Sequence, residues 1–516
     1  MIKSNSKIAL SRVSPCEKSV NVVHLGLGAF YRAFACHYFQ KLNAIKKNSV
    51  RIMGVSLRTP DLIRVLARQD GLFTAFEKGP SQLRPQVLDS ICEAVFAPDS
   101  PSYLLEALAS PTVSLVTLTI TEKGYCLVPS SGELDLTSED IIYDLEHPKA
   151  PRTAIAFIVY SLNLRMNRGL RPFTCLSCDN LPSNGAVLSN AVLKFAKNID
   201  EGLCNWISEF GIFPSSMVDR IVPAISHDDI DYLSDFMPHI DLAPVVHEPY
   251  SLWVIESTVE TNIEFNLQEV GVKIVANIED FERLKLRCLN GTHSALAYLG
   301  YLAGFKTIFE VVSQPVFEVF LNKLWNNEIL PSVIPPPDFE TSAYIEKLFE
   351  RYKNPNIRHL TKQIAMDGSQ KLPQRILGTI IDNLKFERNI DLLCEVIAAW
   401  IRYTSGKDEF GNRFDVIDPK SQKFCFLVLL LYKPHFDVQD LVHGHGDEVS
   451  AYDAFMNGQD ETFAHHRRMV RHFLRMHETI DPVAANSSKK NGQHHQLQKP
   501  LRRHEHPIRR HCALSI

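Results

Sequence analysis

The chain has 516 residues, more than one ordinary hydrophobic core accommodates, so at least two domains are expected. Its 45% hydrophobic and 22% charged residues are typical of a globular protein, and the formal net charge of −4 argues against a general nucleic-acid binder. No apolar run has the length of a membrane span, and residues 1–7 lack the apolar core of a signal peptide, so we expect a cytoplasmic protein that binds neither membrane nor nucleic acid.

The first recognisable unit is a strand, a glycine turn and a helix. Residues 19–25 read as a buried strand, and the sequence GLGAFYR at 26–32 opens a helical pattern that runs to residue 39. Gly26 allows a tight turn, and Gly28 lets the backbone approach a pyrophosphate at the start of the helix. Tyr31 replaces the third glycine of the G-x-G-x-x-G pattern, so the pattern alone also fits an ordinary turn.

Three further apolar strands are expected at residues 50–56, 113–120 and 173–178. Ligands of open α/β sheets bind at the carboxyl ends of parallel strands, where this chain carries polar residues; an ordinary polar turn is the alternative. The second strand is followed by Arg58 rather than by an acidic residue. Arginine is able to accept a 2′-phosphate, whereas an acidic group would hold the ribose hydroxyls of NAD, so the residues leave NAD and NADP open.

The stretch ERLKLRCLNGTHS at 282–294 sets Lys285, Asn290 and His293 in the order K-x4-N-x2-H. In an α-helix, at about 100° per residue, the three side chains spread over roughly 140° of one face. A desolvated lysine can act as a general base, an amide can donate to an alkoxide, and an imidazole can hold a hydroxyl. A basic helix start followed by an Asn-Gly break is the alternative interpretation.

From about residue 280 strand patterns thin out, and amphipathic helical runs are expected at 282–320, 341–352 and 390–403. We therefore predict a Rossmann-like nucleotide-binding domain at 1–280, a mainly helical domain at 281–480 and a disordered tail at 481–516. Eleven cysteines without a repeating spacing predict free thiols, and the pair Cys175 and Cys178 is expected to be buried. Histidines gather after residue 430 among polar residues without a period, and we expect no metal site.

Six stretches together resemble the long-chain mannitol dehydrogenase family. They are GLGAFxR at 26–32, TITEKGY at 119–125, SCDNL at 177–181, FPxSMVDR at 213–220, EPYxxWVIE at 248–256 and KxxxxNxxH at 285–293. The family includes mannitol 2-dehydrogenase, arabinitol dehydrogenase and fructuronate reductase (mannonate oxidoreductase). Two later stretches, IAMDGSQKLPQR at 364–375 and AAWIRY at 398–403, look most like the fructuronate reductase branch. Tyr31 departs from the histidine that is usual in the family, and Phe34-Ala35 from a His-Gln pair.

The resemblance implies a zinc-independent hydride transfer between a nicotinamide cofactor, NAD with NADP not excluded, and a secondary alcohol or ketone. Lys285 matches the catalytic base, Asn180 and Asn290 the amides that stabilise the alkoxide, His293 a partner of a substrate hydroxyl, and Asp219 a supporting acid. The implied cofactor contacts come from the glycine turn and from the ends of two strands: Gly26, Gly28, Ala29, Phe30, Arg32, Arg58, Glu122 and Lys123.

A uronate substrate carries a carboxylate, for which Lys371 and Arg375 are the candidate partners. The expected function is thus the interconversion of a fructuronate- or mannonate-type sugar acid by a monomer or small homo-oligomer. The alternatives are a mannitol or arabinitol 2-dehydrogenase and a catalytically silent relative.

Overall fold

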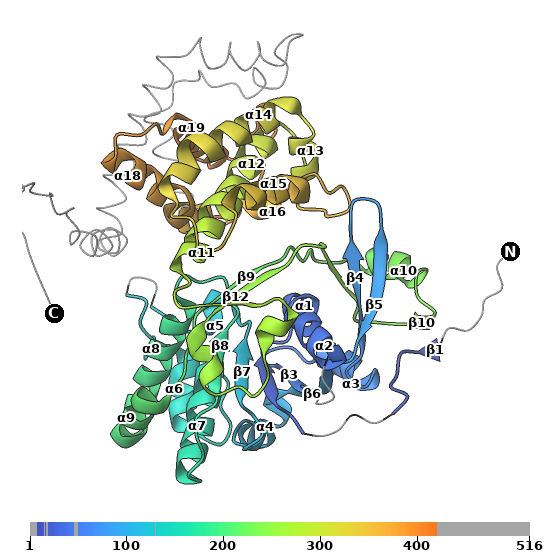
Figure 1. Ribbon diagram of the computed structural model, residues 1–516, viewed down its shortest axis with the longest axis vertical. Coiled ribbons are helices and arrows are strands. Elements are labelled where there is room, and N and C mark those ends of the chain that lie inside the picture. The colour runs from blue at the N-terminus through green and yellow to red at the C-terminus, as the bar shows by residue number, and fades with distance from the viewer. Residues whose placement is uncertain (1–7, 15, 17–18, 46–49, 129–130, 420–516) are drawn as a thin grey trace, which may run out of the picture. The chain divides into compact units, whose positions relative to one another are not determined.

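A computed structural model describes residues 8–419, apart from 15, 17–18, 46–49 and 129–130. Its central sheet has five parallel strands in the order β6-β3-β2-β7-β8 (Figure 1). They are β2 (Val22–Leu25), β3 (Ile52–Ser56), β6 (Ile91–Phe96), β7 (Leu115–Leu118) and β8 (Thr174–Ser177). In chain order, β3 and then β6 are added on one side of β2, and the next strand of this sheet, β7, is added on the other side of β2. This reversal is a topological switch point, where open α/β sheets bind their ligands.

Both faces of this sheet are covered, because neighbouring residues of a strand point to opposite sides. Val22 and Leu115 lie in the core under α1 (Ala29–Ala33) and α2 (Ala35–Ile45). Val23 and Val116 lie in a second core. Helices of that second core include α4 (Pro101–Leu108), α7 (Ala154–Asn167), α8 (Asn184–Lys197) and α9 (Glu201–Phe210). Figure 1 shows α6–α9 on one flank of the sheet and α1–α3 on the other. The four strands expected from their apolar runs all belong to this sheet and are shorter than expected, while β6 was missed.

Three smaller sheets complete the first part of the chain. The strand orders are β13-β12-β9, β11-β4-β5 and β1-β10. Their strands are β1 (Ile8–Ala9), β4 (Phe73–Lys78), β5 (Leu83–Leu88), β9 (Ser216–Asp219), β10 (His239–Ile240), β11 (Val245–His247), β12 (Leu252–Glu256) and β13 (Lys273–Val275). The remaining α-helices of this part are α3 (Asp61–Arg68), α5 (Thr121–Gly124), α6 (Glu139–Glu146) and α10 (His227–Ser234). β9 pairs antiparallel with β12, and Asp219 ends the ladder opposite Leu252.

After β13 the described residues form helices and no further strand. The α-helices are α11 (Glu279–Leu284), α12 (Thr292–Leu302), α13 (Ile308–Val312), α14 (Pro315–Lys323), α15 (Thr341–Tyr352), α16 (Thr361–Ala365), α17 (Gly368–Leu372), α18 (Gly378–Lys385) and α19 (Asp391–Tyr403). The π-helical segments are Lys285–Gly291, Leu324–Ile329 and Pro373–Leu377. The single run expected at 282–320 is wrong, because a π segment and a break at Gly304 (φ 87°) interrupt it. The runs at 341–352 and 390–403 are confirmed as α15 and α19.

The domain boundary near residue 280 stays a prediction, although α11 begins there. The tail at 481–516 and the histidines after residue 430 lie outside the described residues. Among the helices that are described, none combines the length and apolar character needed to cross a membrane.

Candidate active site

Lys285 lies at the junction of three elements that are far apart in the sequence. It follows α11, and its Nζ donates to Asn180 Oδ1 at 2.7 Å and to the Val218 carbonyl at 2.6 Å. Asn180 follows β8, and Val218 belongs to β9. An ammonium group has three donors, and these two bonds leave one N–H for another oxygen.

The environment of Lys285 favours its neutral form more than water does. Its exposed fraction is 9%, and burial lowers its pKa from 10.5 to about 8. Asp219 opposes this shift, while Arg351 and Arg375 add to it. A lysine with a pKa of about 8 exchanges its proton near neutral pH, as a general acid–base group must.

The segment that carries Lys285 and Asn290 is a π-helix, which corrects the α-helical geometry assumed above. A π-helix bonds residue i to residue i+5, so five residues make roughly one turn. Lys285 and Asn290 are five residues apart and therefore share one face. The Asn290 Oδ1 position is buried and has no hydrogen-bond partner among the described residues. An amide terminus left open in this way is suited to a ligand group.

Asp219 is held by Arg351 of α15 in a buried ion cluster with Glu248. Arg351 bonds Asp219 at 2.7 and 3.0 Å and Glu248 at 2.7 and 2.8 Å. The three side chains are 5%, 2% and 2% exposed. Burial opposes ionisation of Asp219, but Arg351 and the Tyr344 hydroxyl outweigh it and hold the pKa of Asp219 below its usual value. Asp219 is therefore a fixed anion near Lys285.

His293 points its Nε2 at His359 Nδ1, 3.1 Å away. Its ring also lies 5.1 Å from the ring of Tyr352. Burial, followed by His359 and nearby arginines, keeps the pKa of His293 well below 6.5. Burial likewise lowers the pKa of His359 to about 4. Both imidazoles are neutral at pH 7.

Arg375 belongs to a second π-helical segment that packs against the first. A Cβ on Gly291 would lie 3.1 Å from the Arg375 carbonyl oxygen, so only a glycine permits this approach of the two backbones without displacement. The Arg375 guanidinium donates to Ser294 Oγ at 3.2 Å, and Lys371 Nζ donates to the Met366 carbonyl at 2.7 Å. Within the described residues neither cation forms an ion pair. Since Arg375 lowers the pKa of both Lys285 and Lys371, the three cations belong to one electrostatic cluster.

A cavity of about 670 Å³ lies at the carboxyl ends of β2, β3 and β7. This is the switch point of the sheet, and the volume suits a cofactor. Gly26 turns with φ 93°, and a Cβ there would lie 2.3 Å from the Thr119 carbonyl oxygen, so the turn requires glycine. Gly26 and Arg58 line the cavity as expected. Asp140 and Arg152 also line the cavity, and the sequence alone did not single them out.

The other expected cofactor residues are not among those that line this cavity, and their role at the cofactor stays a prediction. Gly28 caps α1, Ala29 is exposed, and Phe30 stacks on Phe34 at 5.2 Å. Arg32 is 5% exposed and donates to the carbonyls of Gly28 and Ala243, because its position on α1 faces the core. It therefore connects the glycine turn with the segment between β10 and β11.

Glu122 and Lys123 are exposed on α5. The charge of Glu122 acts on Lys371 and Arg375, so Glu122 lies towards the cation cluster rather than in the wall of the cavity.

Tyr31, which replaces the third glycine of the pattern, stacks on His24 beneath the glycine turn, with 3.3 Å between the ring centroids. The Thr117 hydroxyl forms hydrogen bonds with both side chains.

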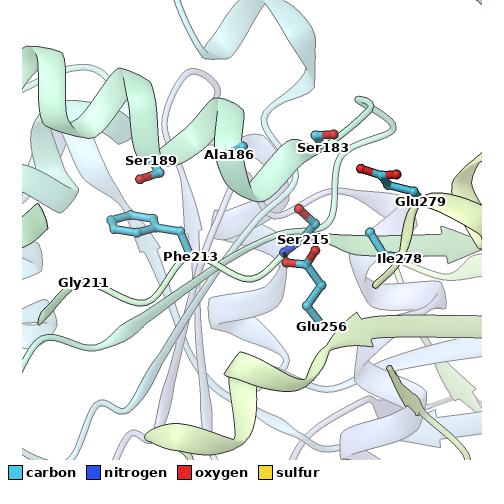
Figure 2. Close-up of a pocket in the computed structure, with 9 residues that line it drawn as sticks. All are labelled: Ser183, Ala186, Ser189, Gly211, Phe213, Ser215, Glu256, Ile278 and Glu279. Carbon is cyan, nitrogen blue, oxygen red and sulfur yellow. Dashed lines mark hydrogen bonds between the residues drawn. The ribbon is translucent and has the colours of Figure 1, made fainter. Parts of the chain in front are cut away.

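A second cavity, of about 460 Å³, opens between α8, the segment before β9, the end of β12 and the start of α11 (Figure 2). Ser183, Ser215, Glu256 and Glu279 are among its lining residues. The Ser183 N–H donates to Glu282, one turn before Lys285, and burial raises the pKa of Glu282 to about 7. This cavity thus borders the carboxylate nearest in sequence to Lys285.

The thiols of Cys175 and Cys178 are free and buried, as expected. Within the described ranges, no group of three or more histidine, cysteine or acidic residues has the geometry to hold a metal ion.

Sequence reasoning missed Arg351, Glu248 and His359 as members of the site. For Arg351 a signal was present, because Tyr344, Leu348 and Arg351 recur at helical spacing on the buried face of α15. A charge on an apolar face indicates a buried partner of opposite charge.

Comparison with known proteins agrees with this geometry. The family model of the mannitol dehydrogenase Rossmann domain matches residues 20–269, and that of the mannitol dehydrogenase C-terminal domain matches residues 277–430. D-mannonate oxidoreductase of Escherichia coli is 40% identical over 428 residues, covering 82% of this chain and 88% of that protein. Mannitol 2-dehydrogenase of Neosartorya fischeri is 36% identical over 445 residues, covering 84% and 88%.

Among solved structures, Pseudomonas fluorescens mannitol 2-dehydrogenase in a ternary complex with NAD and D-mannitol has a TM-score of 0.74 and 32% identity, and covers 95% of this chain and 97% of its own. A D-sorbitol dehydrogenase has the same TM-score with 26% identity, covering 93% and 97%. These matches confirm the expected fold class, a Rossmann-like α/β domain followed by a mainly helical one, and the oxidoreductase class. The chain therefore belongs to the mannitol dehydrogenase family.

Proposed function

We propose that this oxidoreductase interconverts the ketone and the secondary alcohol of a sugar acid of the fructuronate and mannonate type, with NAD as cofactor and Lys285 as the acid–base group. The cofactor assignment draws on the cavity at the switch point and on the NAD in the related mannitol 2-dehydrogenase complex. The site residues are assigned from the geometry around Lys285.

NAD, when bound, supplies or accepts the hydride. In ketone reduction the free N–H of the Lys285 ammonium donates to the substrate oxygen and transfers its proton as negative charge develops there. Asn180 accepts the Lys285 hydrogen bond at its Oδ1, so its Nδ2 is available to donate to the same substrate oxygen. The Nδ2 of Asn290, which shares the face of Lys285, is a second donor for it. Oxidation runs the same steps backwards, starting from the neutral amine.

Asp219 supports this chemistry without moving a proton. Arg351 keeps it ionised, and its charge raises the pKa of Lys285 against the effect of burial. The balance between desolvation and Asp219 therefore tunes Lys285 to about 8, where both directions of the reaction are accessible.

The choice of a sugar acid rests on Arg375 and Lys371, which form no ion pair with any of the described residues. Partly buried cations without a carboxylate partner are costly unless a ligand supplies the anion. Arg375 offers a planar fork that matches a carboxylate, and Lys371 adds a second charge. An uncharged polyol would leave both cations unpaired. The 40% identity to a D-mannonate oxidoreductase supports this choice, while the 36% identity to a mannitol 2-dehydrogenase supports the alternative.

A substrate panel tests the proposal. Purified protein with NADH is assayed by nicotinamide absorbance with fructuronate, tagaturonate, fructose and xylulose, and the uronates are expected to react with the highest kcat/KM. Arg375→Ala should weaken uronate binding by about 1.5–3 kcal/mol, the range for hydrogen bonds to a charged group, and leave an uncharged ketose nearly unchanged. The exposed Arg358, changed to alanine, is the matched control and should leave the uronate KM unchanged.

Ready reduction of fructose with no turnover of fructuronate would refute the sugar acid and favour the mannitol dehydrogenase alternative. Absence of turnover with every substrate, in either direction, would favour the silent relative.

A further inference from the structure

The cofactor cavity carries two arginines that the mechanism above does not use. Arg58 and Arg152 both line it, and both side chains are exposed. Neither guanidinium forms an ion pair with a carboxylate in the part of the chain that the structure describes. Among the described residues that line the cavity, Asp140 is the one acidic side chain. The charged part of the lining is therefore more positive than negative.

Arg58 stands where a Rossmann domain contacts the adenosine ribose of its cofactor. β3 is the second strand of the unit that begins with β2, and it ends at Ser56, two residues before Arg58. In this fold an acidic residue after the second strand holds the 2′-hydroxyl of NAD, whereas a nearby arginine accommodates the 2′-phosphate of NADP. The Ser56 hydroxyl donates to the Thr59 carbonyl at 2.7 Å, and Leu57 is apolar. The charged side chain that directly follows the strand is thus Arg58.

Arg152 is held by an aromatic stack in the wall of the same cavity. Its guanidinium carbon lies 3.5 Å from the centroid of the Tyr143 ring, and Tyr143 stacks in turn on His147 with 4.0 Å between the ring centroids. The Arg152 backbone N–H also donates to Asp144 at 2.6 Å. A guanidinium stacked on an aromatic ring has lost side-chain freedom before a ligand arrives, and the N–H groups at its edge remain able to donate. Arg152 is thus positioned in advance for an anion.

Contacts in the cavity wall bring the two arginines into one region. Burial raises the pKa of the Cys126 thiol, Asp140 adds to that shift and Arg58 opposes it, so both charges lie near this thiol. Asp140 is three residues before Tyr143, on the neighbouring turn of α6, and Tyr143 carries Arg152. Two guanidiniums and one carboxylate leave this region with a net positive charge. A phosphate monoester, with a charge of about −1.5 to −2 at pH 7, is complementary to it.

We propose that Arg58 and Arg152 bind the 2′-phosphate of NADP(H), so that this chain accepts NADP(H) as well as NAD(H). The inference rests on the proposed function, since it concerns the cofactor of the same reaction, and it makes both arginines residues of cofactor specificity. A phosphate offers three acceptor oxygens, to which a guanidinium donates two parallel hydrogen bonds. NAD(H) has a hydroxyl at this place and binds through the glycine turn at Gly26, which both cofactors share.

Fluorescence titration of the purified protein with NADH and with NADPH tests the proposal without any substrate. The wild-type Kd values for the two reduced cofactors should lie within about tenfold of each other. Arg58→Ala should weaken NADPH binding about tenfold or more, the value of one hydrogen bond to a charged group, and change NADH binding by less than about twofold. Arg152→Ala should act in the same direction. Arg64→Ala is the matched control, because this exposed arginine of α3 does not line the cavity.

A charge reversal sharpens the test. Arg58→Glu places a carboxylate after β3, so it should weaken NADPH binding about a hundredfold or more and retain NADH binding. Because the contact with the phosphate is ionic, added salt should weaken NADPH binding more steeply than NADH binding in the wild type, and this difference should decrease in Arg58→Ala.

A wild-type Kd for NADPH more than about tenfold above that for NADH would overturn the inference. Equal weakening of both cofactors by Arg58→Ala would also overturn it, because Arg58 would then contact the pyrophosphate that both share. A protein that binds NADPH as expected but reduces none of the panel substrates contradicts the proposed function and leaves this inference standing, whereas binding of neither cofactor contradicts both. Melting temperatures of the variants separate loss of fold from loss of binding.

Discussion

The ion cluster of Arg351, Asp219 and Glu248 makes a quantitative prediction about stability. Arg351→Met removes four hydrogen bonds and leaves two carboxylates, each 2% exposed, without the guanidinium that pairs with both of them. Breaking a buried pair in this way costs about 3–5 kcal/mol. That is a large part of the roughly 5–15 kcal/mol by which folded proteins are stable. The entropy of unfolding is about 2.1 cal/mol/K per residue, so a unit of roughly 400–500 residues shifts by about 1 °C per kcal/mol, and the melting temperature should fall by about 3–6 °C.

The assay is thermal and urea unfolding of wild type and variant at several pH values. Without Arg351, the buried carboxylates of the folded variant take up protons as the pH falls. The difference in the free energy of unfolding between wild type and variant should therefore decrease towards pH 4. Arg168→Met is the matched control, because its ion pair with Glu106 is 41% and 59% exposed, and pairs of that kind contribute about 0–1 kcal/mol. An Arg351→Met variant that unfolds like the Arg168→Met control would refute the reasoning.

Four further predictions concern the reaction, the cofactor and acid stability. Lys285→Ala should lose roughly 10²–10⁴-fold in kcat and still quench NADH fluorescence normally; near-wild-type turnover would remove Lys285 from the mechanism. Because its pKa is about 8, kcat/KM for oxidation should rise with pH to a plateau above about 8, and that for reduction should fall above it; a flat profile contradicts the assignment. Gly26→Ala should weaken NADH binding about tenfold or more, because a Cβ there meets the Thr119 carbonyl and strains the turn by about 1–3 kcal/mol. Gly132→Ala is the control: no atom lies within 4 Å of a Cβ at that position, and this variant should bind NADH normally. Burial lowers the pKa of His24 from 6.5 to about 3, so the neutral ring stabilises the fold fully above pH 6.5 and the protein loses stability as the pH falls below it. The free energy of unfolding should fall by about 1.4 kcal/mol by pH 5.5 through this group. If the free energy of unfolding of His24→Gln depended on pH as steeply as that of the wild type, this prediction would be contradicted.

The sequence by itself determined the features that depend on local periodicity and on single-residue geometry. Apolar runs predicted four strands of the central sheet, because strands buried on both faces are continuously hydrophobic. The need for a glycine at Gly26 follows from one tight turn. Helical spacing located α15, which buries one face, and a long apolar run located α19, which is buried on nearly all sides.

Tertiary structure decided which polar groups meet. Lys285 and Asn180 are 105 positions apart, and Arg351 and Asp219 are 132 apart; no local pattern encodes either contact. Arg32 was expected at the cofactor and is instead turned into the core, because the packing of α1 sets the direction of its side chain. The π-helical turn at Lys285 likewise arises where two backbones meet at Gly291. Local sequence specifies periods and turns, whereas the pKa of Lys285 depends on desolvation and on charges brought together only when distant segments pack.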